Sequence, residues 1–412
     1  MKKCIKPSEV KGIIQAPASK SVAQRAIALA SLSRGRSVIT NAGDSDDCSA
    51  AIRVCRTLAV KIEEHDGVLL VDGGIKLPNE PLNCGESGLG IRMFSAIAAT
   101  LNGTVELTGG GSLQHRPMGI IADALTPLGV SCSTNSGLLP IKVHGPINGG
   151  KTRVDGSLSS QVLTGLLMAS PLAGSDVEID VSNLKSVPYV ELTIDMMRQF
   201  GIEVRNDKNQ RFSVRAPQVY TPCSYNVEGD WSGAAFMLVA GATAGEVKVT
   251  NLNQQSLQAD RYIVDALIWA GAHVSIDGNC ILVRKDRLIG FNFDATNCPD
   301  LFPPLVALAA HCNGESAILG VNRLKVKESD RAATLMAEFT KLGVDIKVQG
   351  DLMVVRGGTV RSAKVQSYGD HRIAMACAVA ALGGQGDVEI DNAGAVSKSY
   401  PNFFEDLSKV KC

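Results

Sequence analysis

One arrangement of hydrophobic and polar residues recurs six times along this chain of 412 residues. A helix rich in Ala and Leu ends close to a glycine. A strand with charged residues at alternate positions follows, which is typical of a half-buried strand. The glycines lie 68 to 72 residues apart, at Gly35, Gly103, Gly174, Gly245, Gly314 and Gly386.

A second pattern lies between these segments: an amphipathic helix ends at a small residue and leads into a strand, and a further strand follows. Glycine is expected there because it adopts the left-handed conformation that ends a helix without strain. The chain is therefore predicted to contain six repeats of helix–strand–helix–strand–strand. The sixth is cut short, and a strand around Ile5 can complete it. The small residues lie 70 to 72 residues apart, at Ala59, Gly129, Gly201, Gly271 and Gly343.

The first helix of each repeat is apolar on every face, as in residues 305–310 and 374–380. A helix without a polar face is a buried helix. A single hydrophobic core stops growing at about 250–300 residues, so six repeats are expected to divide into two domains of three. The predicted fold class is α/β: two domains, each with the helices in its interior and the sheets outside.

Composition excludes several classes of protein. The chain has 41 Lys and Arg against 41 Asp and Glu, so the net charge is zero, and aromatic residues make up 4%. Nucleic-acid binding is therefore not expected. No apolar run reaches the ~20 residues of a membrane span, and no signal peptide or metal-ligand set stands out. The 11 Cys form no Cys-x-x-Cys pair, which favours reduced thiols and the cytoplasm.

Cations gather at equivalent ends of the repeats. Ser and Asp residues at the starts of the buried helices have an ordinary interpretation as helix caps. Cations there oppose the positive end of the helix dipole, so their presence predicts a bound anion. Asp370-His371 is either a base with its orienting partner or a further cap. The eight candidate cations are Lys20, Arg25, Arg92, Arg116, Lys327, Arg331, Arg372 and Lys398.

Five motifs together resemble the enolpyruvyl transferases, and among them the 5-enolpyruvylshikimate-3-phosphate synthase (3-phosphoshikimate 1-carboxyvinyltransferase) family, over essentially the whole chain. They are Ser19-Lys20-Ser21 with Arg25, residues 156–161 followed by Leu163-Thr164, and residues 327–331, 370–375 and 398–401. The resemblance implies two inside-out α/β barrels of three repeats, which close on substrate. It places residues 15–227 in the shikimate 3-phosphate domain. Residues 1–14 and 228–412 then form the phosphoenolpyruvate domain.

The resemblance implies transfer of the enolpyruvyl group of phosphoenolpyruvate to the 5-hydroxyl of shikimate 3-phosphate, with release of phosphate, on the route to chorismate and aromatic amino acids. It implies a monomer with these two small-molecule substrates and no cofactor, metal, nucleic acid or membrane partner. Asp300 is the implied base, with Lys20, and Glu328 the implied acid. Shikimate 3-phosphate would contact Lys20, Ser21, Arg25, Ser159, Ser160, Gln161, Ser186, Tyr189, Asp300, Arg323 and Lys327. Phosphoenolpyruvate would contact Lys20, Gly88, Arg116, Gln161, Arg331, Arg372 and Lys398.

The chain departs from this family at two places. Residues 86–89 read Glu-Ser-Gly-Leu where the family often has Asn-Ala-Gly-Thr, and Arg323 replaces an Asn that commonly contacts the shikimate. One alternative is the UDP-N-acetylglucosamine enolpyruvyl transferase family. That family has a reactive Cys at the position of Gly111 and an Asn at that of Ser21. The other is a non-catalytic anion-binding protein on the same fold, which would not need Lys20, Asp300 and Glu328 together.

Overall fold

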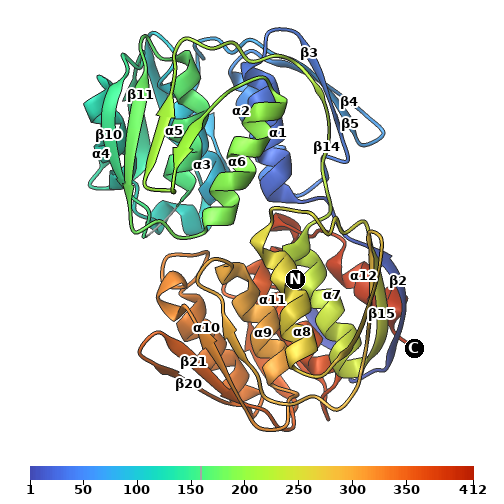
Figure 1. Cartoon of the computed structure of the whole chain (residues 1–412). Coiled ribbons are helices and arrows are strands. Elements are labelled where there is room, and N and C mark those ends of the chain that lie inside the picture. Colours follow the sequence, from blue (N-terminus) through green and yellow to red (C-terminus); the bar gives the residue numbers. More distant parts are fainter. Residues whose placement is uncertain (158–159) are drawn as a thin grey trace. The chain divides into compact units, whose positions relative to one another are not determined.

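The computed structural model describes residues 1–157 and 160–412 and divides into two compact domains. The middle domain comprises Lys20–Val227, and the terminal domain joins Met1–Ser19 to Glu228–Cys412 (Figure 1). The resemblance places the first boundary at residue 15, whereas the compact domains change over at Lys20. Residues 15–19 lie with the terminal domain, where Ala16 N–H donates to the carbonyl of Thr250 and Ser19 N–H to that of Glu228.

In the described part of the middle domain, three helices fill the interior: α1 (Lys20–Leu32), α3 (Gly88–Ala98) and α5 (Gln161–Ala169). The second helices of the repeats are α2 (Asp46–Thr57), α4 (Gly119–Leu125) and α6 (Val187–Gln199). The strands form sheets in the orders β14-β3-β5-β4, β6-β7-β9-β8 and β10-β11-β13-β12. Their bounds are β3 (Arg36–Thr40), β4 (Lys61–His65), β5 (Val68–Asp72), β6 (Leu82–Asn83), β7 (Thr104–Thr108), β8 (Ser131–Asn135), β9 (Leu138–His144), β10 (Gly150–Asp155), β11 (Val177–Ser182), β12 (Arg205–Asp207), β13 (Arg211–Val214) and β14 (Ser224–Asn226).

The terminal domain repeats this plan. Its interior helices are α7 (Trp231–Ala244), α9 (Phe302–Ala309) and α11 (His371–Leu382), and its second helices are α8 (Ile263–Trp269), α10 (Arg331–Lys341) and α12 (Phe403–Val410). The sheets have the orders β16-β17-β15-β2, β18-β19-β21-β20 and β1-β23-β22. Their strands are β1 (Lys2–Ile5), β2 (Val10–Gln15), β15 (Gly245–Thr250), β16 (His273–Asp277), β17 (Cys280–Arg284), β18 (Asn292–Asp294), β19 (Glu315–Leu319), β20 (Asp345–Gln349), β21 (Leu352–Arg356), β22 (Ala363–Gln366) and β23 (Val388–Asp391).

The N-terminal strand completes the sixth repeat, as predicted. β1 pairs antiparallel with β23, and Ile5 lies opposite Val388. One strand of each repeat was not predicted: a short strand before the buried helix. In four repeats, as with β6 and β22, this strand runs parallel to the strand after the same helix. The other two are exchanged, since β2 precedes α1 but pairs with β15, and β14 precedes α7 but pairs with β3. These strands were missed because two to six residues carry too little alternation to register as a period.

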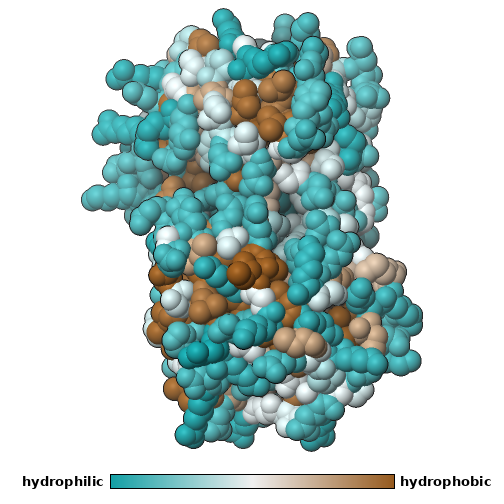
Figure 2. All heavy atoms as spheres, turned by 90° about the vertical axis from the view of Figure 1, so that its right-hand side faces the viewer, coloured by the Kyte–Doolittle hydropathy of each residue, from teal (hydrophilic) through white to brown (hydrophobic). Residues whose placement is uncertain are grey.

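The interior helices confirm the inverted arrangement. Every residue of α3, α7, α9 and α11 is buried, and the sheets lie outside the helices (Figure 1). Polar side chains gather on the surface, where hydrophobic residues form only scattered groups on the face drawn in Figure 2. In the described part of the chain, no helix combines the length and the apolar character that crossing a bilayer requires.

A pair of glycines closes several repeats. The N–H groups of Gly73, Gly145 and Gly357 donate to the carbonyls of Gly35, Gly103 and Gly314, at 3.0, 3.3 and 3.1 Å. Each donor glycine lies against the last carbonyls of a buried helix, so that a Cβ atom there would overlap backbone oxygen. The recurring glycines therefore let a strand end pass directly over a helix end.

We predict that Gly357→Ala destabilises the protein by about 2 kcal/mol, because overpacking against backbone that cannot move is costly. A Cβ atom on Gly357 would overlap the carbonyl oxygen of Cys312 and lie 2.6 Å from that of Ala309. Gly358→Ala is the matched control, since a Cβ there meets no atom within 4 Å. Urea unfolding should lower the midpoint for Gly357→Ala alone. Equal midpoints for the two variants would contradict the close approach.

Candidate active site

The starts of the buried helices hold both caps and charges. Ser87 accepts a hydrogen bond from Gly90 N–H at 3.0 Å, Asp230 from Ser232 N–H at 3.1 Å, and Asp370 from Arg372 N–H at 3.0 Å. The capping interpretation of these residues therefore holds. His371 Nδ1 lies 3.8 Å from the Asp370 carboxylate, too far for a hydrogen bond, so Asp370 acts as the cap and does not orient His371.

In the middle domain, Lys20 begins α1 and binds a carboxylate. Its Nζ lies 2.8 Å from Oδ2 of Asp47, and the two side chains are 11% and 6% exposed. Asp47 stands in the first turn of α2. Sequence reasoning missed Asp47, because an acidic residue in the first turn of a helix is explained by the helix dipole alone.

Arg25 is a buried cation among uncharged acceptors. Its guanidinium donates to Thr193 Oγ1 at 2.9 Å, to the Ser21 carbonyl at 2.8 Å, and more weakly to Thr164 Oγ1 and the Tyr189 carbonyl. Burial lowers the pKa of Arg25 to about 10, and nearby Tyr side chains only partly offset this. Because a buried charge costs free energy unless it meets an opposite charge, Arg25 gains from any anion that reaches it.

A second group of cations surrounds Gly88, the first residue of α3. The guanidinium of Arg92 donates to the Gly88 carbonyl at 3.0 Å and to Gln161 Oε1 at 3.1 Å. A Cβ atom on Gly88 would overlap Nη1 of Arg116 and lie 3.1 Å from Nη1 of Arg92. The missing side chain of Gly88 therefore leaves room for two guanidinium groups and one amide at the start of a helix.

Glu86, which belongs to the departure at residues 86–89, packs against Gly111. Gly111 has φ +51°, and a Cβ atom there would overlap the carboxyl group of Glu86. Glu86 Oε2 in turn accepts the N–H of Ser112 at 3.4 Å. The place that a cysteine side chain would take at position 111 is thus filled by Glu86.

The remaining predicted residues of the middle domain lie at helix starts. Ser21 is in α1, Ser160 directly precedes Gln161 of α5, and Ser186 precedes α6 with φ 55°. Ser160 and Ser186 are buried. Tyr189 lies in α6, and its carbonyl accepts the weak bond from Arg25. Ser159 lies outside the described residues.

In the terminal domain, the guanidinium of Arg331 joins three carboxylates. Nη1 lies 2.6 Å from Asp300 Oδ1, Nη2 lies 2.5 Å from Glu328 Oε2, and Nε lies 2.7 Å from Asp370 Oδ2. The Arg331 side chain is 1% exposed. This interaction assembles the predicted base and the predicted acid around one cation. Asp370, which sequence reasoning took only as a cap or an orienting partner, is the third carboxylate.

Asp300 is also reached by two further cations. Lys327 Nζ lies 3.4 Å from Oδ1, and Arg372 Nη2 lies 3.2 Å from Oδ2. Burial by itself raises the pKa of Asp300, but the charges of Arg372, Lys327 and Arg331 outweigh it and hold that pKa well below its ordinary value. Burial lowers the pKa of Lys327, partly offset by the negative charge of Asp300. Asp300 is therefore ionised throughout the neutral range.

Arg323 and Lys398 complete the predicted set. Arg323 ends a short 3-10 turn, and burial lowers its pKa while the negative charge of Asp300 raises it. The side chain therefore lies within electrostatic reach of the base. Lys398 ends the 3-10 segment Ala393–Lys398, which packs against α11, and it is 5% exposed. Among the described residues, no group of three or more His, Cys, Asp or Glu side chains is placed to hold a metal ion.

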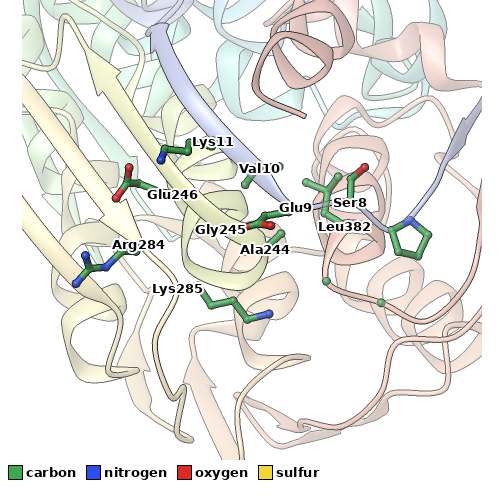
Figure 3. Close-up of a pocket in the computed structure, with 13 residues that line it drawn as sticks. Ser8, Glu9, Val10, Lys11, Ala244, Gly245, Glu246, Arg284, Lys285 and Leu382 are labelled. Carbon is green, nitrogen blue, oxygen red and sulfur yellow. The ribbon is translucent and has the colours of Figure 1, made fainter. Parts of the chain in front are cut away.

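A separate hollow of about 770 Å³ opens at the other end of the interior helices of the terminal domain, beside Ala244 and Leu382 (Figure 3). None of its lining residues is a predicted site residue. Its charged residues Lys11, Glu246 and Arg284 stand opposite one another on neighbouring strands. Alternating charges across a sheet are an ordinary way to stabilise strand pairing, so this hollow is not the candidate site.

Comparisons with known proteins agree with one another. A family model described as EPSP synthase (3-phosphoshikimate 1-carboxyvinyltransferase) matches residues 5–407. A protein of Methanocorpusculum labreanum named 3-phosphoshikimate 1-carboxyvinyltransferase is 37% identical, with 100% of this chain and 98% of the relative covered. One of Clostridium novyi with the same name is 38% identical, with 98% and 96% covered.

A solved structure agrees with these matches. The EPSP synthase of Acinetobacter baumannii superposes with a TM-score of 0.83 at 25% identity, over 100% of this chain and 98% of that one. Both the sequence and the fold therefore match from end to end, and the two-domain inside-out barrel predicted from the repeats is confirmed. This chain belongs to the EPSP synthase (3-phosphoshikimate 1-carboxyvinyltransferase) family.

Proposed function

We propose that this protein transfers the enolpyruvyl group of phosphoenolpyruvate to the 5-hydroxyl of shikimate 3-phosphate and releases phosphate. The observation that carries the proposal is the set of buried cations at the helix starts, together with a carboxylate pair fixed on Arg331. Both substrates carry a phosphate and a carboxylate, so both need cations. Binding of anions alone needs no base and acid, whereas the proposed transfer needs both, and Asp300 and Glu328 can supply them.

We propose that shikimate 3-phosphate binds at the starts of α1, α5 and α6. Arg25 meets only uncharged oxygen atoms in its hydrogen bonds, so an anionic group would restore its charge balance. Ser21, Ser160, Gln161, Ser186 and Tyr189 would add neutral contacts, and Ser159 is proposed on sequence alone. Lys20, Asp300, Arg323 and Lys327 complete the set.

Phosphoenolpyruvate is proposed to bind the cations around Gly88 and those that now pair with Asp300. The set is Lys20, Gly88, Arg116, Gln161, Arg331, Arg372 and Lys398. Arg372 holds Asp300 through a single contact of 3.2 Å, so an incoming phosphate or carboxylate can compete for it. Guanidinium groups suit both anions because they present paired donors in a plane.

Proton transfer would follow from the same competition. In the first step the 5-hydroxyl oxygen bonds to C2 of phosphoenolpyruvate, its proton passes to Asp300 assisted by Lys20, and Glu328 gives a proton to the methylene carbon. In the second step the adduct loses a methyl proton to Glu328 as the C2–O bond to phosphate breaks, and the departing phosphate takes the proton held by Asp300. Anionic substrates draw cations from Asp300 and so raise its basicity when it must act.

Neither step forms a covalent bond to the protein. The catalytic effect would therefore come from positioning and from the electrostatic field of the buried charges. We further infer a monomer that works in the cytoplasm, in agreement with eleven free cysteines.

The function itself is tested by incubating the protein with both substrates and assaying free phosphate. We expect release that depends on both compounds. UDP-N-acetylglucosamine in place of shikimate 3-phosphate should release no phosphate. The family that uses this substrate has a reactive cysteine at the position of Gly111, and here Glu86 fills the place of that side chain. If folded protein releases no phosphate above background with shikimate 3-phosphate, the proposal is wrong.

Glu328→Gln separates turnover from binding. We expect kcat to fall by about 10²–10⁴-fold, the usual contribution of a general acid, while the KM values change by less than about threefold. Arg331 keeps two carboxylate partners in this variant, so the site stays assembled. Glu315→Gln, at an exposed glutamate, is the control. Parallel losses in kcat and in affinity would argue against an acid role.

Gly88→Ala tests the phosphoenolpyruvate set. The new methyl group would overlap Nη1 of Arg116 and force that guanidinium to shift. We expect KM for phosphoenolpyruvate to rise about tenfold with KM for shikimate 3-phosphate unchanged. Gly110→Ala serves as the control, since a Cβ atom there meets nothing within 4 Å. A rise confined to the KM for shikimate 3-phosphate would instead place Gly88 in the shikimate 3-phosphate set.

A further inference from the structure

Four of the repeats bring a residue at the start of the buried helix against a residue 27 or 28 positions later. Lys20 meets Asp47 and Asp300 meets Lys327, both 27 positions apart. Gly88 lies against Arg116, 28 positions later. In the fourth repeat the corresponding pair is Ser232 and Asp260, also 28 apart, and Ser232 Oγ donates to Oδ2 of Asp260. Asp260 thus occupies the place that supplies site residues in other repeats.

The segment that carries Asp260 is held firmly. The preceding Gln258 donates to Glu228 Oε1 at 2.8 Å and to the Gly229 carbonyl at 2.9 Å, and its Oε1 accepts the N–H of Trp231 at 3.2 Å. These bonds join the 3-10 segment Ala259–Tyr262 to the start of α7. Asp260 itself is 0% exposed, so its carboxyl group cannot turn to water.

Like charges face this carboxyl group. Asp300 and Asp230 act on it electrostatically, Arg372 is the opposing cation, and Asp260 in turn acts on the thiol of Cys298. Its Oδ1 has no hydrogen-bond partner among the described residues. An ionised oxygen left without a donor in a buried place is costly, and a protonated carboxyl group avoids much of that cost.

The surroundings therefore favour an ionised Asp300 and an uncharged Asp260. Three cations keep Asp300 ionised. Burial and the negative charge of Asp300 raise the pKa of Asp260 to about 7, although Arg372 and the hydrogen bond from Ser232 lower it. Asp260 is consequently neutral below pH 7 and becomes ionised above it. Ionisation places one more negative charge within electrostatic reach of Arg372.

We propose that Asp260 is a positioning residue of this site: its proton leaves the charge of Arg372 free for an anionic substrate, and loss of that proton weakens the attraction. The proposal rests on the proposed function, in which Arg372 binds phosphoenolpyruvate. Asp260 touches neither substrate and acts only through Arg372 and Asp300. Its effect appears in KM for phosphoenolpyruvate and leaves kcat nearly unchanged.

The test compares pH profiles of the wild type and Asp260→Asn from pH 6 to pH 8. A phosphate monoester itself titrates at about pH 6, so the two proteins are compared at each pH. At pH 6 the KM values for phosphoenolpyruvate should agree. At pH 8 the wild-type KM should be about tenfold higher than that of Asp260→Asn, the effect of one nearby charge, with kcat within about twofold. Asp277→Asn, at an exposed aspartate, should follow the wild type.

Ser232→Ala supplies a second variant if Asp260→Asn fails to fold. Since the hydrogen bond from Ser232 lowers the pKa of Asp260, its removal should move the rise in KM to higher pH. Parallel profiles for all variants, or equal losses in kcat and affinity at every pH, would overturn the proposal.

An infrared measurement keeps this test separate from that of the proposed function. The carbonyl band of a protonated carboxyl group should be present in the wild type at pH 6, fade by pH 8, and be absent from Asp260→Asn. The band with no phosphate release from the wild type would refute the proposed function and leave the protonation of Asp260 established. Phosphate release without the band would refute the role of Asp260 alone.

Discussion

The buried guanidinium of Arg331 is the interaction on which the candidate site depends. A cation that is 1% exposed costs much free energy unless opposite charges meet it, and Asp300, Glu328 and Asp370 do so at 2.5 to 2.7 Å. These three come from the segments before α9, before α10 and before α11. Removal of one partner from a buried ion pair costs about 3–5 kcal/mol, so the segments are bound to a single arrangement. Asp300 and Glu328, the proposed base and acid, hold their positions because the buried charge of Arg331 needs them there.

The middle domain also buries cations, but not all of them have a carboxylate as partner. Lys20 has a carboxylate partner in Asp47, whereas the hydrogen bonds of Arg25 go to hydroxyl and carbonyl oxygens. Neutral acceptors satisfy the geometry of a guanidinium group but not its charge. The terminal domain therefore carries cations that are already paired, and the middle domain carries at least one that gains most when an anion arrives. Substrate binding would then exchange partners in one domain and supply a missing charge in the other.

The sequence predicts the helices and sheets of this protein better than its buried ion pairs. A period of about 70 residues identifies the buried helices and the completion of the last sheet by β1, because burial and alternation repeat along the chain. The same period does not predict β6, because its two residues are too few to show alternation. Asp47 and Asp260 escaped notice because each looks like an ordinary acidic residue at the start of a helical segment. Their meaning depends on contacts 27 and 28 residues away.

That spacing also explains why the chemistry lies where it does. A helix buried on every face has little place for a charge along its length. Its charged residues therefore lie in its first two turns, as Lys20, Arg25 and Arg92 do, or in the segment that packs beside its start. The segment before the second helix is the one that each repeat brings there, as Asp300–Lys327 and Gly88–Arg116 illustrate. Six copies of one constraint thus yield six helix starts with different side chains.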